Sequence, residues 1–158
     1  MYRLAIFDLD GTLADTSSWY MPGGARIFED MRSAVVTLHE NGVMLSIATM
    51  MDTPSAMGVV SSWDVGGLFS SVRGADFPCD KGDLIAMCVR EARVDPKEAV
   101  MVGDNWSDLT GAARAGVDFL VAPRCEESDL WPVKACRPSD GEELARMIAV
   151  PGRRPITD

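Results

Sequence analysis

A short apolar run near the start of the chain ends abruptly in two acidic residues. Residues 4–7 (Leu-Ala-Ile-Phe) lead directly into residues 8–12 (Asp-Leu-Asp-Gly-Thr). An apolar run of this length is typical of a buried strand, and the glycine lets the backbone turn away after it. Asp8 and Asp10 are therefore expected close together at the carboxyl end of this strand. Such a pair repels itself unless a cation lies between the oxygens or one acid is protonated; an ordinary Asp-rich turn is the alternative interpretation.

Three later segments carry polar groups at similar junctions. The strand-like residues 99–102 run into residues 103–108 (Gly-Asp-Asn-Trp-Ser-Asp), which hold a second pair of acids. Residues 45–48 (Leu-Ser-Ile-Ala) end at Thr49, and Lys81 begins a helical pattern. In parallel sheets, ligands bind outside the carboxyl ends of the strands. The sequence therefore predicts that these groups meet at one edge of a sheet.

Hydrophobic periodicity alternates between strands and helices along the whole chain. It predicts strands over about residues 3–8, 43–48, 69–73, 98–103 and 117–121. It predicts helices that begin at Pro22 and end at Gly42, that follow a cap at Thr53-Pro54, and that cover about residues 81–93, 107–115 and 141–149. Strands separated by helices imply an α/β fold, a Rossmann-like parallel sheet with helices on both faces. Residues 1–150 are expected to form a single domain, and residues 151–158 a mobile tail.

The charge balance limits the partners of the protein. The chain has 158 residues, with 24 acidic residues, 15 basic ones and a net charge of −9. Proteins that bind nucleic acid present basic faces, so no nucleic-acid partner is expected. No apolar stretch is long enough to span a bilayer and the N-terminus lacks a secretory pattern, so we expect no membrane partner and a cytoplasmic location. The four cysteines form no Cys-x-x-Cys pair, which is typical of reduced thiols.

The four polar segments, in this order, resemble the haloacid dehalogenase superfamily of phosphohydrolases, in its phosphoglycolate-phosphatase-like branch. The resemblance covers residues 4 to about 122, and Asp-x-Asp-Gly-Thr combined with a later Gly-Asp-x-x-x-Asp is its specific part. Members that act as dehalogenases lack the second acid, so Asp10 indicates the phosphate-handling members. Many members insert a cap domain after the first or second motif. Here only residues 13–21 lie between the Asp-rich loop and the first predicted helix, and a predicted helix and short strand fill the interval between Thr49 and Lys81. We therefore expect no cap.

The resemblance implies a role for each of the catalytic and substrate-binding residues. Asp8 would be the nucleophile that forms an aspartyl-phosphate, and Asp10 the acid that protonates the leaving group and later deprotonates water. Thr49 and Lys81 would bind the phosphate. Thr49 could instead bond only its own backbone. Two positions depart from the pattern: Met50 stands where relatives often carry Asn, and Gly follows the lysine where Pro is usual.

The resemblance also implies a metal ion. Mg²⁺ is the expected cofactor, since carboxylate, carbonyl and water ligands select it. Its ligands would be Asp8, the backbone carbonyl of Asp10, and Asp104. Asp108 would bind it through water or support these ligands; because it stands at a predicted helix start, it could also cap that helix.

The favoured function is a Mg²⁺-dependent phosphomonoester hydrolase that acts on a small phosphorylated metabolite. One alternative is a phosphatase without a cap that acts on a phosphoprotein or another bulky substrate. Another is a non-catalytic binding module that keeps the fold. Transfer to an acceptor other than water is less favoured, because it needs a cap that excludes water.

The expected open site bears on oligomeric state. Apolar side chains that could rim it are Trp19, Tyr20, Met21, Met51 and Trp106. They could contact the organic part of a substrate, pack beneath loops, or form a subunit contact in a homodimer.

Overall fold

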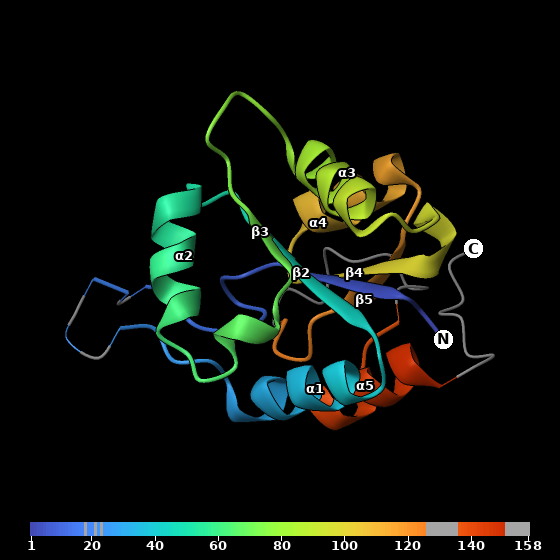
Figure 1. The fold of residues 1–158 in the computed structure, drawn as a ribbon, viewed down its shortest axis with the longest axis horizontal. Coiled ribbons are helices and arrows are strands. Elements are labelled where there is room, and N and C mark those ends of the chain that lie inside the picture. The colour runs from blue at the N-terminus through green and yellow to red at the C-terminus, as the bar shows by residue number, and fades with distance from the viewer. Residues whose placement is uncertain (18, 21, 23, 126–135, 151–158) are drawn as a thin grey trace.

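A five-stranded parallel sheet lies at the centre of the protein in the computed structural model (Figure 1), which describes residues 1–17, 19, 20, 22, 24–125 and 136–150. The strand order is β3-β2-β1-β4-β5. Their bounds are Leu4–Phe7 for β1, Met44–Ala48 for β2, Ser71–Arg73 for β3, Ala99–Gly103 for β4 and Asp118–Val121 for β5. All four strand pairs are parallel. The first strand of the chain is therefore the central one, and its carboxyl end lies in the middle of one sheet edge.

Helices cover both faces of the sheet. They are α1 (Glu29–Glu40), α2 (Thr53–Ser61), α3 (Lys81–Ala92), α4 (Trp106–Ala115) and α5 (Gly141–Ala149), with 3-10 turns at Gly66–Leu68 and Pro96–Glu98. Figure 1 shows α1 beside α5 on one face and α3 with α4 on the other. All four residues of β1 are fully buried. Ala5 and Phe7 belong to the core beneath α1 and α5, and Leu4 and Ile6 to the core beneath α3 and α4, which is why this strand reads as a continuous apolar run.

The predicted α/β fold is confirmed, and the predicted start of the first helix is wrong. Helix α1 begins at Glu29 instead of Pro22. The residues before it are held in an extended path by the loop after β1. Ile27 forms an antiparallel bridge to Ala14, and Phe28 donates its N–H to the carbonyl of Leu13. Tertiary pairing with that loop thus overrides the helical spacing that the sequence shows.

The cap of the second helix is also one residue earlier than predicted. The side chain of Asp52 accepts the N–H of Ser55 at 2.9 Å, so Thr53 and Pro54 are the first residues of the helix. Proline is favourable there because its missing N–H has no helical partner in any case. Trp63 is buried and lies after the end of α2.

The described residues contain no inserted domain between the motifs. A loop bound to the core joins β1 to α1, and α2, a 3-10 turn and β3 fill the interval from β2 to α3. The expectation of a core without a cap fits this arrangement. None of the described helices is long and apolar enough to cross a membrane. The predicted tail, residues 151–158, lies outside the described residues.

Candidate active site

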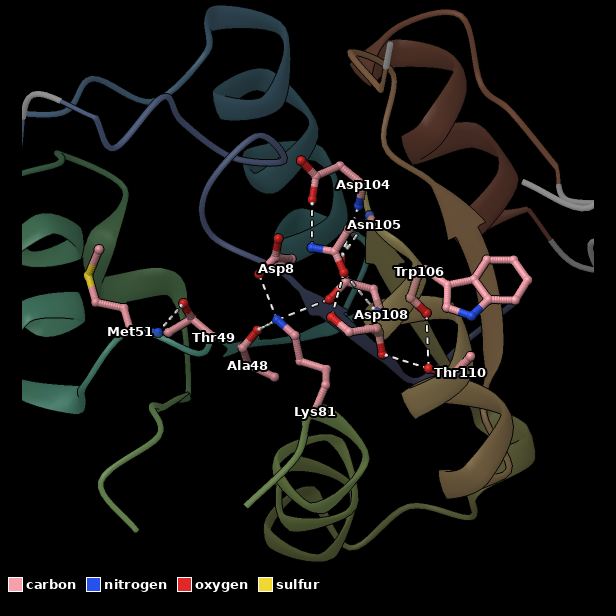
Figure 2. A network of polar contacts seen from close by, with 11 residues as sticks. Asp8, Ala48, Thr49, Met51, Lys81, Asp104, Asn105, Trp106, Asp108 and Thr110 are labelled. Atoms are coloured by element: carbon pink, nitrogen blue, oxygen red, sulfur yellow. Dashed lines mark hydrogen bonds and ion pairs between the residues drawn. The ribbon is translucent and has the colours of Figure 1, made fainter. Parts of the chain in front are cut away.

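The predicted site residues gather at the carboxyl edge of the sheet (Figure 2). Asp8 follows β1, Thr49 follows β2 and Asp104 follows β4, so the parallel strands deliver all three to the same edge. Lys81 is the first residue of α3 and enters from the helical layer. The sheet order therefore brings together groups that lie far apart in the sequence.

A buried ion pair connects the helical layer to the central strand. The Nζ of Lys81 donates to Oδ1 of Asp8 at 2.7 Å and to the carbonyl of Ala48 at 2.9 Å, and it lies 3.0 Å from Oδ1 of Asp108. Only 3% of the Lys81 side chain and 8% of the Asp8 side chain are exposed. Burial alone would lower the pKa of Lys81, but Asp8 and Asp108 outweigh it and the pKa is raised. The lysine therefore stays charged and holds the Asp8 carboxylate in place.

Two glycines allow α3 and α4 to approach closely enough for these contacts. A Cβ on Gly111 would lie 2.9 Å from the backbone nitrogen of Gly82 and 3.2 Å from Cβ of Lys81. A Cβ on Gly82 would lie 3.1 Å from Nε of Arg114, which forms ion pairs with the acids at the start of α3, Asp80 and Asp83. The glycine that departs from the family pattern thus makes room for an arginine that joins the two helices.

Asp108 supports both its own helix and the lysine. Its Oδ2 accepts the backbone N–H of Asp104 at 3.1 Å and of Asn105 at 3.3 Å, as in a capping box. Its Oδ1 faces Lys81. A Cβ on Gly103 would collide with this carboxylate, so only glycine lets β4 pass so close. The capping role considered for Asp108 is therefore present, together with an ion pair that the sequence did not reveal.

Three carboxylates converge beside this lysine. Asp8, Asp104 and Asp108 each offer an oxygen within 4.8 Å of the others. Gly11 has a φ of +76°, and a Cβ at this position would collide with the Asp104 carboxylate. The loop after β1 can therefore approach Asp104 only because it carries glycine here. Burial, followed by the charge of Asp8, raises the pKa of Asp104 to about 8. The same two causes raise that of Asp108 to about 6, although Lys81 opposes them.

This donor set fits a hard divalent cation. Three acids share one ammonium group, so their repulsion is relieved by a further positive charge or by a proton on one of them. All of the available side-chain donors are carboxylate oxygens, which Mg²⁺ prefers over nitrogen or sulfur. The side chain of Asp10 is not part of this group, so its expected contribution through the backbone carbonyl stays a prediction.

Asp10 is oriented by a residue that sequence reasoning missed. Its Oδ1 accepts the backbone N–H of Thr16 at 2.9 Å and the Thr16 hydroxyl at 2.8 Å. Asp10 is exposed, whereas Thr16 is buried. The buried threonine therefore holds the exposed Asp10 carboxylate in one orientation. Aspartate side chains often accept N–H groups of the nearby backbone, but which N–H Asp10 accepts depends on the path of the loop.

Thr49 bonds its own backbone and still has a hydrogen to donate. Its Oγ1 accepts the N–H of Met51 at 3.2 Å, which leaves the hydroxyl hydrogen available to a ligand. The N–H of Met50 has no partner among the described residues. The Thr49 hydroxyl and the Met50 N–H, two donors that suit a phosphate, therefore lie next to each other at the end of β2.

A cavity of about 460 Å³ opens beside the acids, and its lining combines acidic, aromatic and basic groups: Asp10, Gly11, Asp15, Phe28, Asp104, Asn105, Arg124 and Cys125. None of the described members of the expected apolar rim lines this cavity. Trp19 and Tyr20 are exposed and contact each other, while Met51 packs against the core. Figure 2 shows the Trp106 ring directed away from Asp8. Met21 lies outside the described residues.

Comparison with known proteins identifies the family. A model of the haloacid dehalogenase-like hydrolase family matches residues 23–122, more than half of the chain. The chain therefore belongs to this family of hydrolases. The match includes Thr49, Lys81 and Asp104, which carry three of the four motifs.

The curated proteins that resemble the chain in sequence include a kinase and a phosphatase. The tyrosine-protein kinase PtkA of Mycobacterium tuberculosis is 30% identical over 98 residues, which are 60% of this chain and 34% of PtkA. The phosphoglycolate phosphatase of Vibrio vulnificus is 26% identical over 95 residues, which are 58% of this chain and 42% of that protein. The matched region thus spans less than half of either relative.

Solved structures share the fold at low sequence identity. PtkA of Mycobacterium tuberculosis superposes with a TM-score of 0.76 at 21% identity, over 94% of this chain and 99% of that one. CbbY from Rhodobacter sphaeroides, in complex with phosphate, gives 0.76 at 17% identity, over 91% and 96%. A haloacid dehalogenase superfamily hydrolase from Geobacter sulfurreducens gives 0.73 at 20% identity, over 93% and 100%.

The raised pKa of Asp104 predicts a pH-dependent stability in the absence of divalent cations. An acid whose folded-state pKa exceeds its unfolded value destabilises the fold as pH rises between the two, here from the usual 3.8 towards about 8. We expect the melting temperature of the chelated protein to fall as pH rises from about 5 to about 8, across most of this interval. The Asp104→Asn variant should show a flatter profile. Glu40→Gln, at the far end of α1, is the control, and a variant profile as steep as that of the parent would contradict the assignment.

The close approach of α3 and α4 predicts an unusual response to alanine. Replacing glycine by alanine inside a helix usually stabilises by up to ~1 kcal/mol. Gly111→Ala should instead lower the free energy of unfolding, because its Cβ would press on Gly82 at 2.9 Å. Gly58→Ala in α2, where nothing lies within 4 Å of the new Cβ, is the matched control and should stabilise. Equal stabilisation of both variants in urea unfolding would contradict the close contact.

Proposed function

We propose that the protein is a Mg²⁺-dependent phosphomonoester hydrolase that acts through an aspartyl-phosphate on Asp8. The observation that carries this proposal is the buried Asp8 carboxylate, which Lys81 holds at 2.7 Å in the middle of the carboxyl edge of the sheet. A fixed carboxylate beside a cation, with further acids converging on it, suits attack on a phosphorus centre whose charged oxygens need neutralising. The similarity to phosphoglycolate phosphatase supports the same reaction.

The chain's residues supply each part of this reaction. An oxygen of Asp8 attacks phosphorus, the ester P–O bond breaks, and Asp10 donates a proton to the departing oxygen. Asp10 then accepts a proton from the water that attacks the aspartyl-phosphate, which releases inorganic phosphate and restores Asp8. The Thr49 hydroxyl and the Met50 N–H donate to the phosphoryl oxygens, and Lys81 offsets their charge.

Mg²⁺, when bound, neutralises charge on the phosphoryl oxygens and on the acids that hold it. Asp8, Asp104 and the backbone carbonyl of Asp10 would hold the ion. Asp108 would support it through water, since its Oδ2 already accepts two backbone N–H groups. Burial and the charge of Asp8 raise the pKa of Asp104, and a cation bound beside it would favour its ionised form.

The size of the cavity favours a small phosphorylated substrate. A volume of about 460 Å³ is in the range of small-molecule sites. The similarity to PtkA, a tyrosine-protein kinase, keeps a phosphoprotein as the second candidate substrate. A binding module without catalysis is less favoured, because Asp8, Asp10, Lys81 and Asp104 are all present. A cytoplasmic location and a homodimer stay part of the proposal.

Asp8→Asn tests the nucleophile. The change keeps the size of the side chain and removes the attacking charge, so we expect Mg²⁺-dependent hydrolysis of an aryl phosphate to fall by roughly a thousandfold or more. Circular dichroism would check that the variant stays folded. Asp15→Asn, which removes an acid from the lining of the same cavity, is the control and should retain activity. A loss of less than about tenfold in Asp8→Asn, ~1.4 kcal/mol of barrier, would rule out the covalent mechanism.

Mg²⁺ should both stabilise the protein and activate it. A ligand that prefers the native state raises stability by about 2.7 kcal/mol at a hundred times its dissociation constant. We therefore expect a higher melting temperature with Mg²⁺ and no turnover after exhaustive chelation. Asp104→Asn should lose most of this thermal shift, whereas Asp15→Asn should keep it. Full turnover by the chelated protein would contradict the metal requirement.

A further inference from the structure

One basic side chain lines the cavity beside the acids. Arg124 follows β5 and lies in the same lining as Asp10 and Asp104. It is the only lysine or arginine among the described residues of that lining, in a chain with a net charge of −9. Thr49 and Lys81, which are proposed to bind the phosphoryl group, do not line this cavity. A cation thus stands apart from the phosphate-binding groups.

Arg124 is held in one orientation by two partners. Its guanidinium carbon lies 4.1 Å from the centre of the Phe28 ring, and its Nη2 lies 2.5 Å from Oδ1 of Asp30. The other oxygen of Asp30 accepts the N–H of Gly141 at 2.9 Å. A Cβ on Gly141 would collide with the carbonyl of Asp30, so the start of α5 closes directly on this acid. The ring and the acid together fix the plane of the guanidinium.

The remaining donors of Arg124 are available to a ligand. A guanidinium carries five N–H groups, and the structure gives only the bond from Nη2 to Asp30 among the described residues. The Arg124 side chain is 40% exposed and lines the cavity, so a ligand there can approach its unused N–H groups. If Arg124 served only to pair with Asp30, it would not need to be exposed to the cavity or to share its lining with Asp10. Its exposure and position therefore point to a ligand.

The position of Asp10 tells which part of a substrate enters this cavity. In the proposed reaction Asp10 protonates the oxygen that leaves phosphorus, so the leaving group must lie on the side that Asp10 faces. Asp10 lines the cavity, and one of its oxygens is fixed by Thr16. The organic part of the substrate therefore extends towards Arg124.

We propose that Arg124 determines specificity by binding a second oxyanion, a carboxylate or another phosphate, on the leaving group of the substrate. The substrate class is then a small phosphomonoester that carries a second acidic group. This proposal rests on the function proposed above. The three acids of the lining, Asp10, Asp15 and Asp104, repel such a group. The preorganised fork of an arginine binds an oxyanion through two parallel hydrogen bonds.

The test compares three esters that differ only in the far end of the leaving group. They are propyl phosphate, the phosphate ester of β-hydroxypropanoate, and propanediol bisphosphate, each assayed with Mg²⁺. For the parent protein we expect kcat/KM to be at least about tenfold higher for one or both anionic esters than for propyl phosphate. The two anionic esters distinguish a carboxylate from a second phosphate as the preferred group.

Arg124→Met and Arg124→Lys distinguish binding of the anionic group by Arg124 from a purely structural role of this residue. Arg124→Met should remove the preference while leaving kcat/KM for propyl phosphate within about twofold, and Arg124→Lys should keep only part of the preference. Arg90→Met, which removes an exposed cation from α3, is the control for net charge and should change neither value. A preference that survives Arg124→Met, or an equal loss for all three esters, would overturn the proposal.

A binding experiment distinguishes failure of this inference from failure of the proposed function. Calorimetry on Asp8→Asn protein with Mg²⁺ measures affinity for the three esters without turnover. We expect the preferred anionic ester to bind about tenfold more tightly than propyl phosphate, and Arg124→Met in the same background to abolish the difference. Parent protein that hydrolyses none of the esters but shows this binding pattern would reject the hydrolase and keep the subsite. Equal affinities for all three esters would reject the subsite.

Discussion

The buried contact between Lys81 and Asp8 is the interaction on which the rest of the site depends. An ammonium group taken out of water is costly unless other groups pair with it. Lys81 has two carboxylates and a carbonyl, and breaking such a buried pair typically costs ~3–5 kcal/mol. Because Lys81 opens α3, the helix can supply these contacts only if it packs closely against α4, which Gly82 and Gly111 allow. The close packing of α3 against α4 and the position of Lys81 in the site therefore depend on each other.

The same site holds more negative charge than the lysine can balance. Gly11 and Gly103 remove the side chains that would keep Asp104 and Asp108 away from the loops that they approach. The backbone thus brings the acids together against their repulsion, and burial together with the charge of Asp8 raises the pKa of Asp104 to about 8. This cost in stability is typical of functional sites, where local rules of good packing are broken for chemistry. A cation that binds there relieves the repulsion and stabilises the fold at once.

What the sequence could predict was the part that depends on local pattern. The apolar run before Asp8 marks a buried strand, and strands alternating with helices imply a parallel sheet whose carboxyl ends meet. The start of α1 was not predictable in this way, because Ile27 pairs with Ala14 across the loop after β1. The bond from Thr16 to Asp10 and the ion pair of Asp108 depend on the same kind of tertiary contact. In each of these contacts, the two residues meet because of the path of the chain in three dimensions, which hydrophobic periodicity does not reveal.

The two helical layers contribute differently to the proposed site. Lys81, the proposed partner of the nucleophile and of the phosphate charge, comes from the α3 and α4 layer. The Arg124 subsite comes from the opposite layer, because Asp30 belongs to α1 and Gly141 opens α5. Since the described residues insert no domain over this sheet edge, we expect selectivity to come from the loops after the strands and from the groups that anchor them. The leaving group and the phosphoryl group would then be recognised by separate faces of the sheet, so that changes in α1 or α5 could alter substrate choice without disturbing the contact between Lys81 and Asp8.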